Sequence, residues 1–188
     1  MADKISLSLY KDSSYRDREF SQASEDIEQL ADDIDALVEK AYEYLEINEY
    51  ISALNLLSHC LPSNTEDPEI LNGIGIALCE LGKLDESKMV LERAIRYHPG
   101  DALSYANLAG VYWEFEDYEK AIYLYKKSID LDSEMSDSYY NLANLYSEIG
   151  LTYMAFIICN EFITKFPDDP EGQELMDEVI LDLALSMY

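Results

Sequence analysis

The chain of 188 residues carries a formal net charge of −26, from 39 acidic against 13 basic residues, and 48% of it is hydrophobic. This length supports one domain with a buried core. The negative field disfavours nucleic acid and anionic membranes, because phosphate groups would be repelled. It suits basic protein partners, and it equally suits a plain role in solubility.

The three cysteines, Cys60, Cys79 and Cys159, are far apart and form no CxxC pair. We therefore expect neither a disulfide framework nor a zinc site, and we interpret the cysteines as small core residues of a protein in a reducing compartment. No apolar stretch approaches the ~18 residues of a membrane span, and the first residues do not form a signal peptide. A cytoplasmic location is expected.

Residues 1–23 are rich in serine and show no sustained helical period, which predicts a flexible leader. Up to Arg18 the leader is weakly basic, so it either folds back on the acidic remainder or stays a plain tail. Ser24, followed by two acids, is typical of a helix start. Apolar residues at steps of three and four then predict one helix running to about Ile47.

The segment Pro68–Asp101 recurs in the sequence that follows it. Related segments begin near Tyr105 and Tyr139. A fixed period of about 34 residues is typical of stacked helix–turn–helix units. With Pro99 taken as the proline at position 32 of its repeat, as the family resemblance given next implies, the repeats are 34–67, 68–101, 102–135 and 136–169.

These residues resemble the tetratricopeptide repeat (TPR) family, which has bulky residues at positions 4, 7, 11 and 24 of each repeat and small ones at 8, 20 and 27. The second repeat carries all of them: Leu71, Ile74, Leu78, Leu91, Gly75, Ser87 and Ala94. Phe162 departs from the pattern in the fourth repeat, and Lys40 and Thr65 depart in the first. Gly82, Gly150 and Asn48 are predicted to turn the chain between paired helices.

The resemblance implies an all-α fold, a right-handed superhelix (solenoid) of four helical hairpins with a C-terminal capping helix over 170–187. The whole domain is expected to span 24–188. In the capping helix one apolar face includes Leu175, Val179 and Ile180. Leu181, Leu185 and Tyr188 form a second face. This second face either associates with another copy, giving a homodimer, or belongs to a tail packed on the fourth repeat.

In the family, the first helix of each repeat lines a concave groove. The resemblance assigns the following residues to it: Asp35, Tyr42, Glu46, Glu69, Asn72, Glu80, Asn107, Trp113, Glu114, Asp137, Tyr140, Asn141, Asn144 and Glu148. Glutamate occupies position 13 in all four repeats. Such a ladder is unfavourable near helix C-termini, and a cationic ligand would relieve it. The alternative is that glutamate is a good helix former on a solvated face.

The sequence thus predicts a protein–protein interaction scaffold that holds a basic or amphipathic peptide, with a chaperone-like role as its sharper form. A self-assembling module that associates through the last helix is the alternative. We expect no enzyme activity, no catalytic residue, no cofactor and no metal, because no acid, base and nucleophile share a helical face.

Overall fold

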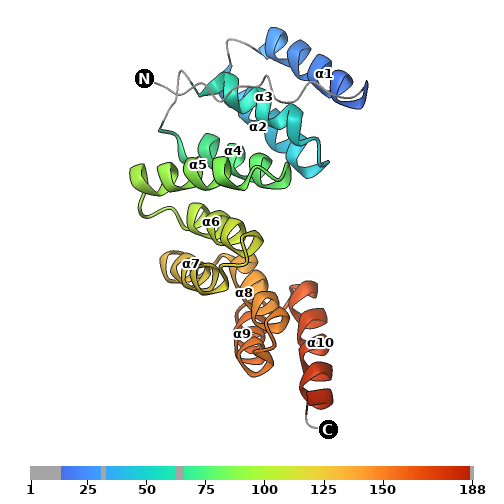
Figure 1. The fold of residues 1–188 in the computed structure, drawn as a ribbon, viewed down its shortest axis with the longest axis vertical. Coiled ribbons are helices and arrows are strands. Elements are labelled where there is room, and N and C mark those ends of the chain that lie inside the picture. The colour runs from blue at the N-terminus through green and yellow to red at the C-terminus, as the bar shows by residue number, and fades with distance from the viewer. Residues whose placement is uncertain (1–13, 31–32, 62–65, 187–188) are drawn as a thin grey trace. The chain divides into compact units, whose positions relative to one another are not determined.

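The computed structural model describes residues 14–30, 33–61 and 66–186, and in this part of the chain all regular structure is α-helical (Figure 1). The helices are α1 (Ser14–Leu30), α2 (Ile34–Glu46), α3 (Tyr50–Cys60), α4 (Pro68–Glu80), α5 (Leu84–Tyr97), α6 (Ala102–Glu114), α7 (Tyr118–Leu131), α8 (Ser136–Glu148), α9 (Thr152–Lys165) and α10 (Pro170–Ser186). The predicted all-α class is confirmed, and the two helices of each hairpin pack antiparallel.

The chain divides into two compact units, Met1–Pro99 and Gly100–Tyr188. The sequence predicts a single domain over 24–188. A division of this kind follows from repeat architecture, because each hairpin contacts its neighbours and the array has no one shared core. Within the first unit α2 pairs with α3 and α4 with α5, and within the second α6 pairs with α7 and α8 with α9.

The first helices of the four hairpins begin at residues 34, 68, 102 and 136. An aspartate precedes three of them, and the side chains of Asp33, Asp67 and Asp101 each accept a hydrogen bond from a backbone N–H of the first turn. These carboxylates satisfy N–H groups that have no partner inside the helix. The start of each of these three helices is therefore fixed by a local side chain as well as by packing.

Each hairpin turns at a residue in the left-handed conformation: Asn48, Gly82, Glu116 and Gly150, with φ of 62°, 69°, 58° and 74°. The following N–H then bonds back to a carbonyl of the first helix, as Lys83 does to Leu78 at 2.8 Å. Asn48, Gly82 and Gly150 are the predicted turn residues. Glu116 gave no such signal, because glutamate is not a residue that favours this conformation.

Small residues let the two helices of a hairpin approach each other. A Cβ atom added to Gly75 would lie 2.5 Å from Cδ2 of Leu91, and the Ser87 hydroxyl donates to the Gly75 carbonyl at 2.7 Å. Phe162, the exception in the fourth repeat, is 1% exposed. It packs against Gly172 of α10, where an added Cβ would lie 3.1 Å from the ring. In the fourth repeat the small residue at this contact is therefore the glycine of the neighbouring helix.

The prediction for the N-terminal region is wrong in two respects. The expected helix from Ser24 to about Ile47 is two helices, because the backbone of Asp33 turns to extended geometry (φ −124°) and its side chain caps α2. The expected flexible leader is partly helical, since α1 begins at Ser14 and Ala23 is fully buried. Residues 1–13 of that leader lie outside the described residues.

Candidate binding surfaces

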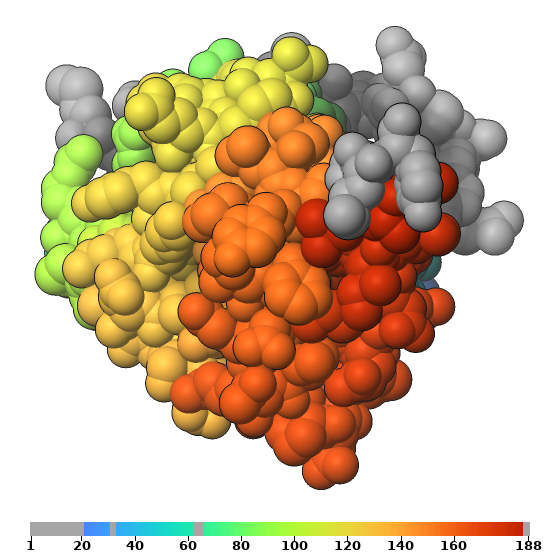
Figure 2. All heavy atoms as spheres, turned by 90° about the horizontal axis from the view of Figure 1, so that it is seen from below, coloured from blue at the N-terminus to red at the C-terminus, as the bar shows by residue number. Residues whose placement is uncertain are grey.

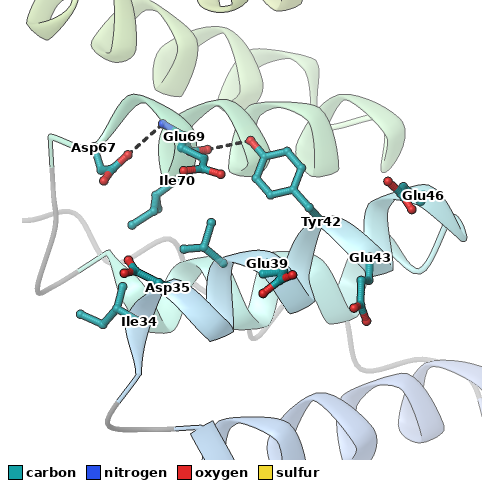
Figure 3. A pocket seen from close by; sticks show the side chains of 10 residues that line it. Ile34, Asp35, Glu39, Tyr42, Glu43, Glu46, Asp67, Glu69 and Ile70 are labelled. Atoms are coloured by element: carbon teal, nitrogen blue, oxygen red, sulfur yellow. Dashed lines mark hydrogen bonds between the residues drawn. The ribbon is translucent and has the colours of Figure 1, made fainter.

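A pocket of about 460 Å³ opens in the first unit between α2 and the start of α4 (Figure 3). The residues that line it are Ile34, Asp35, Val38, Glu39, Tyr42, Glu43, Glu46, Asp67, Glu69 and Ile70. Asp35, Glu39, Tyr42 and Glu46 follow one another at helical steps of three and four, so they lie along one face of α2.

Two hydrogen bonds fix the α4 side of this pocket. The Tyr42 hydroxyl donates to the backbone carbonyl of Glu69 at 3.0 Å, and the Glu69 N–H donates to the Asp67 carboxylate at 2.9 Å (Figure 3). Tyr42 thus ties α2 to the first turn of α4. The pocket wall is set by these bonds before any partner arrives.

The pocket is strongly acidic. Its lining contains six carboxylates, those of Asp35, Glu39, Glu43, Glu46, Asp67 and Glu69, and among the described residues no lysine or arginine lines it. Glu43 is partly neutralised, because Lys40 Nζ lies 2.6 Å from its Oε2, and this hydrogen bond raises the pKa of Lys40. Ile34 adds half-buried apolar surface beside the acids, whereas Val38 and Ile70 in the lining are buried, at 7% and 1% exposure.

The structure brings four of the predicted groove residues to this pocket: Asp35, Tyr42, Glu46 and Glu69. It adds Glu39, Glu43 and Asp67, which the sequence analysis missed: Glu43 and Asp67 are not at the groove positions, and Glu39 shares its repeat position with Asn107 and Asn141 but is not an asparagine. The step of four residues from Asp35 to Glu39 was the available signal. The prediction for Asn72 is wrong, since this side chain is buried at 1% exposure inside α4.

Two of the position-13 glutamates lie beside a tyrosine hydroxyl. In the first unit Glu80 is near the hydroxyl of Tyr50, which itself donates to Asn48 Oδ1 at 2.6 Å, and in the second Glu148 is near the hydroxyl of Tyr118. Each tyrosine is the first residue of the second helix in the preceding hairpin. Burial of the hydroxyl, followed by the charge of nearby glutamates, raises the pKa of both tyrosines.

Glu148 also accepts the indole N–H of Trp113, with Nε1 to Oε2 at 2.9 Å. This bond joins α6 to α8, and the Trp113 ring meets Tyr125 edge-on with 6.4 Å between centroids. The glutamate at position 13 is therefore a structural acceptor in the fourth repeat. All four position-13 glutamates are exposed, and the residue of the second repeat equivalent to Tyr50 and Tyr118 is Leu84.

The remaining predicted groove residues of the second unit vary in exposure. Asp137 is exposed, while Asn107, Tyr140, Asn141 and Asn144 are half-buried. The Tyr140 ring packs edge-on against Phe162, with centroids 6.5 Å apart, so part of it belongs to the core. The first helices of this unit thus carry exposed or half-buried polar side chains among the described residues. Tyr140 offers a partner less aromatic surface than the sequence suggests.

On α10 the predicted self-association residues Leu181 and Leu185 are 60% and 67% exposed, and Tyr188 lies outside the described residues. Leu175 and Val179 are buried, as expected for the inner face. Ile180 is not, at 48% exposure, because α10 contacts α8 and α9 on its other side (Figure 2).

Among the described residues no three His, Cys, Asp or Glu side chains are arranged so that they could hold a metal ion, and no helix is long and apolar enough to cross a membrane. The three cysteines are free thiols. Burial raises the pKa of Cys60, and it raises that of Cys159 to about 11. These two thiols are therefore poor nucleophiles at neutral pH.

Paired antiparallel helices that restart at one fixed interval along the chain define a helical-repeat protein. A family model described as tetratricopeptide repeat matches residues 66–134, so the predicted resemblance to that family is confirmed over this part of the chain.

Among curated proteins, the BBSome complex member BBS4 of Bos taurus is 24% identical over 159 residues. The match covers 82% of this chain, which spans only 30% of the length of that relative. Among solved structures, a thermophilic TPR protein of Thermus thermophilus matches with a TM-score of 0.72 at 17% identity, covering 80% of this chain and 82% of the other. A MamA protein matches with a TM-score of 0.59 at 17% identity, covering 80% and 88%. The structural matches support the fold.

Proposed function

We propose that this chain is a protein-interaction module whose acidic pocket on α2 and α4 takes a basic segment of a partner protein. TPR proteins mediate protein–protein interactions. The observation that carries the proposal is the pocket itself, with six carboxylates around apolar side chains and a volume within the range of ligand sites.

The chemistry of the lining defines the segment. A lysine or arginine places its charge among Asp35, Glu39 and Glu69 while its aliphatic stem lies along the half-buried ring of Tyr42. An adjacent apolar side chain of the partner adds burial on Ile34. Like charges held together in the empty pocket repel, so a cationic ligand gains both its own attraction and the relief of that repulsion.

The proposal is tested with a labelled peptide that contains two lysines and a leucine, measured by fluorescence anisotropy against the full chain. The double variant Glu39→Gln/Glu46→Gln removes two pocket charges, and we expect about a tenfold loss of affinity or more, from ~1 kcal/mol per charge pair. Raising the salt concentration is expected to weaken the wild-type complex, because it screens exposed charges.

The matched control is Glu86→Gln/Glu92→Gln on the exposed surface of α5, which changes the net charge equally. We expect this control to alter the affinity less than twofold. If both double variants weaken binding to the same degree, only the overall field attracts the peptide, and the pocket is not the site.

A chaperone-like role for a basic client, without catalysis, is the sharper form of the same proposal. The free thiols suit a reducing compartment such as the cytoplasm. The net charge of −26 opposes nucleic acid and anionic lipid as partners. In a client-aggregation assay with a basic, aggregation-prone protein, the chaperone-like role requires that the Glu39→Gln/Glu46→Gln variant protect less well than its control.

A further inference from the structure

The last helix occupies the place of a first helix in a fifth hairpin. It begins at Pro170, one repeat length after Ser136, and it packs on α9 and α8 as α4 packs on α3 and α2. Figure 2 shows α10 lying directly against the surface formed by α8 and α9.

The face of α10 that a second helix would cover is exposed. Position 11 of the repeat is buried in three hairpins, at Tyr44, Leu78 and Tyr146, with 5%, 1% and 3% exposure. The equivalent residue of α10, Ile180, is 48% exposed. Position 8, where paired helices approach most closely, is alanine or glycine in every hairpin, and in α10 it is the exposed Asp177.

This face has a definite chemistry. Ile180, Leu181 and Leu185 supply exposed apolar surface, with Asp177 and Glu178 exposed beside it. The helix from 170 to 186 contains five acids and no basic residue. Two copies of such a helix would bring ten like charges together around one apolar stripe, which opposes the homodimer and favours a positively charged occupant.

We propose that the open face of α10 binds an amphipathic helix of a partner protein, with an apolar stripe flanked by lysine or arginine. The partner helix completes a fifth hairpin, antiparallel to α10 as α9 is to α8. Its apolar side chains cover Ile180 and Leu181, and a basic side chain meets Asp177 where the hairpins have a small residue. The site is separate from the pocket on α2 and α4 and does not rest on it.

The test uses the full chain and a labelled helical peptide of five turns with a leucine stripe flanked by lysines. A scrambled peptide of the same composition, which has the charge but no stripe, is the reference probe. We expect the ordered peptide to bind at least tenfold more tightly than the scrambled one. Leu181→Ser/Leu185→Ser is expected to remove this difference, and Asp177→Lys to weaken binding at least fivefold, while circular dichroism shows that both variants keep their helices.

Two controls separate this site from others. Tyr153→Ser changes an exposed apolar residue of α9 and is expected to leave binding unchanged, as is the pocket variant Glu39→Gln/Glu46→Gln. Equal binding by Leu181→Ser/Leu185→Ser and wild type overturns the proposal, as does absence of binding by the wild type. Sedimentation that shows a dimer lost in Leu181→Ser/Leu185→Ser overturns it in favour of a second copy of this chain.

Discussion

At the scale of single residues, the turn of the third hairpin is conformationally strained. Glu116 has a φ of 58°, a region that side chains with a Cβ adopt at a cost of roughly 1–2 kcal/mol and glycine adopts freely. We expect Glu116→Gly to stabilise the protein by about 1 kcal/mol, which raises the melting temperature by roughly 2–4 °C. Thermal unfolding followed by circular dichroism measures this.

The control for that substitution is Glu119→Gly, which lies beyond the turn and inside α7. There glycine is expected to destabilise by about 1 kcal/mol, since it replaces a good helix former. A fall in melting temperature for both variants would mean that the Glu116 side chain itself stabilises the turn.

A buried tyrosine hydroxyl is expected to make the free energy of unfolding fall as the pH becomes alkaline. Burial, and then the hydrogen bond to Asp26, raises the pKa of Tyr44 above its ordinary value of 10.0. A folded-state pKa above the unfolded one contributes stability that is present below pH ~10 and is lost as pH rises through the folded value. We expect the free energy of unfolding to fall between pH 9 and 11.

Urea unfolding at several pH values tests this, with Tyr44→Phe and, as the control for removing a hydroxyl from an exposed site, Tyr123→Phe. At pH 8 Tyr44→Phe is expected to be less stable by about 1–3 kcal/mol, because Asp26 loses its donor in a buried setting. Its decline from pH 9 to 11 is expected to be shallower than that of the wild type. Parallel declines would assign the pH dependence to other groups.

Single residues also show which parts of the candidate site could be predicted from the sequence. The family pattern assigns a direction to each repeat position, and it placed Asp35 and Tyr42 at the surface that the pocket occupies. It placed Asn72 there as well, although Asn72 is buried. Nor did it reveal that Glu148 accepts a hydrogen bond from Trp113, since such contacts link residues of different hairpins whose approach depends on how the hairpins stack.

At the scale of elements, two glycines inside first helices should respond oppositely to the same substitution. Alanine is the better helix former by about 1 kcal/mol, so the surroundings decide the sign. At Gly110 an added Cβ meets only the Tyr125 hydroxyl at 3.6 Å, an ordinary contact, whereas at Gly75 it meets Cδ2 of Leu91 at 2.5 Å and its Cγ at 2.6 Å.

We therefore expect Gly110→Ala to stabilise by up to about 1 kcal/mol and Gly75→Ala to destabilise by about 1–3 kcal/mol, because it forces α4 and α5 apart. Urea unfolding of both variants measures the difference. Stabilisation by Gly75→Ala would show that Leu91 moves aside at little cost, so that the close approach does not require glycine.

The helical elements were largely predictable because each has a local signal. The first helices begin at Ile34, Pro68, Ala102 and Ser136, where the repeat period places them. The break between α1 and α2 was missed, since apolar residues keep the helical step across it and only the Asp33 cap marks the restart. A capping side chain stabilises a helix by about 1 kcal/mol, which is enough to fix where the helix begins. An aspartate in a sequence rich in acids is, however, weak evidence that a helix begins there.

At the scale of the whole chain, the net charge of −26 opposes folding through repulsion among the acids. Added salt screens this repulsion, because the Debye length shortens as the ionic strength rises. We expect the melting temperature to rise as sodium chloride increases from 10 to 200 mM at pH 7.5. A fall over this range would mean that attractive ion pairs, such as Lys165 with Glu134 at 2.9 Å, outweigh the repulsion.

Trp113 is the sole tryptophan of the chain, and its indole bridges two neighbouring hairpins through Glu148. Selective excitation of the indole therefore reports on one site, whose emission depends on whether α6 and α8 remain side by side. Opening of the second unit can be followed in real time without attaching a dye, while α1 to α5 contribute nothing to the signal.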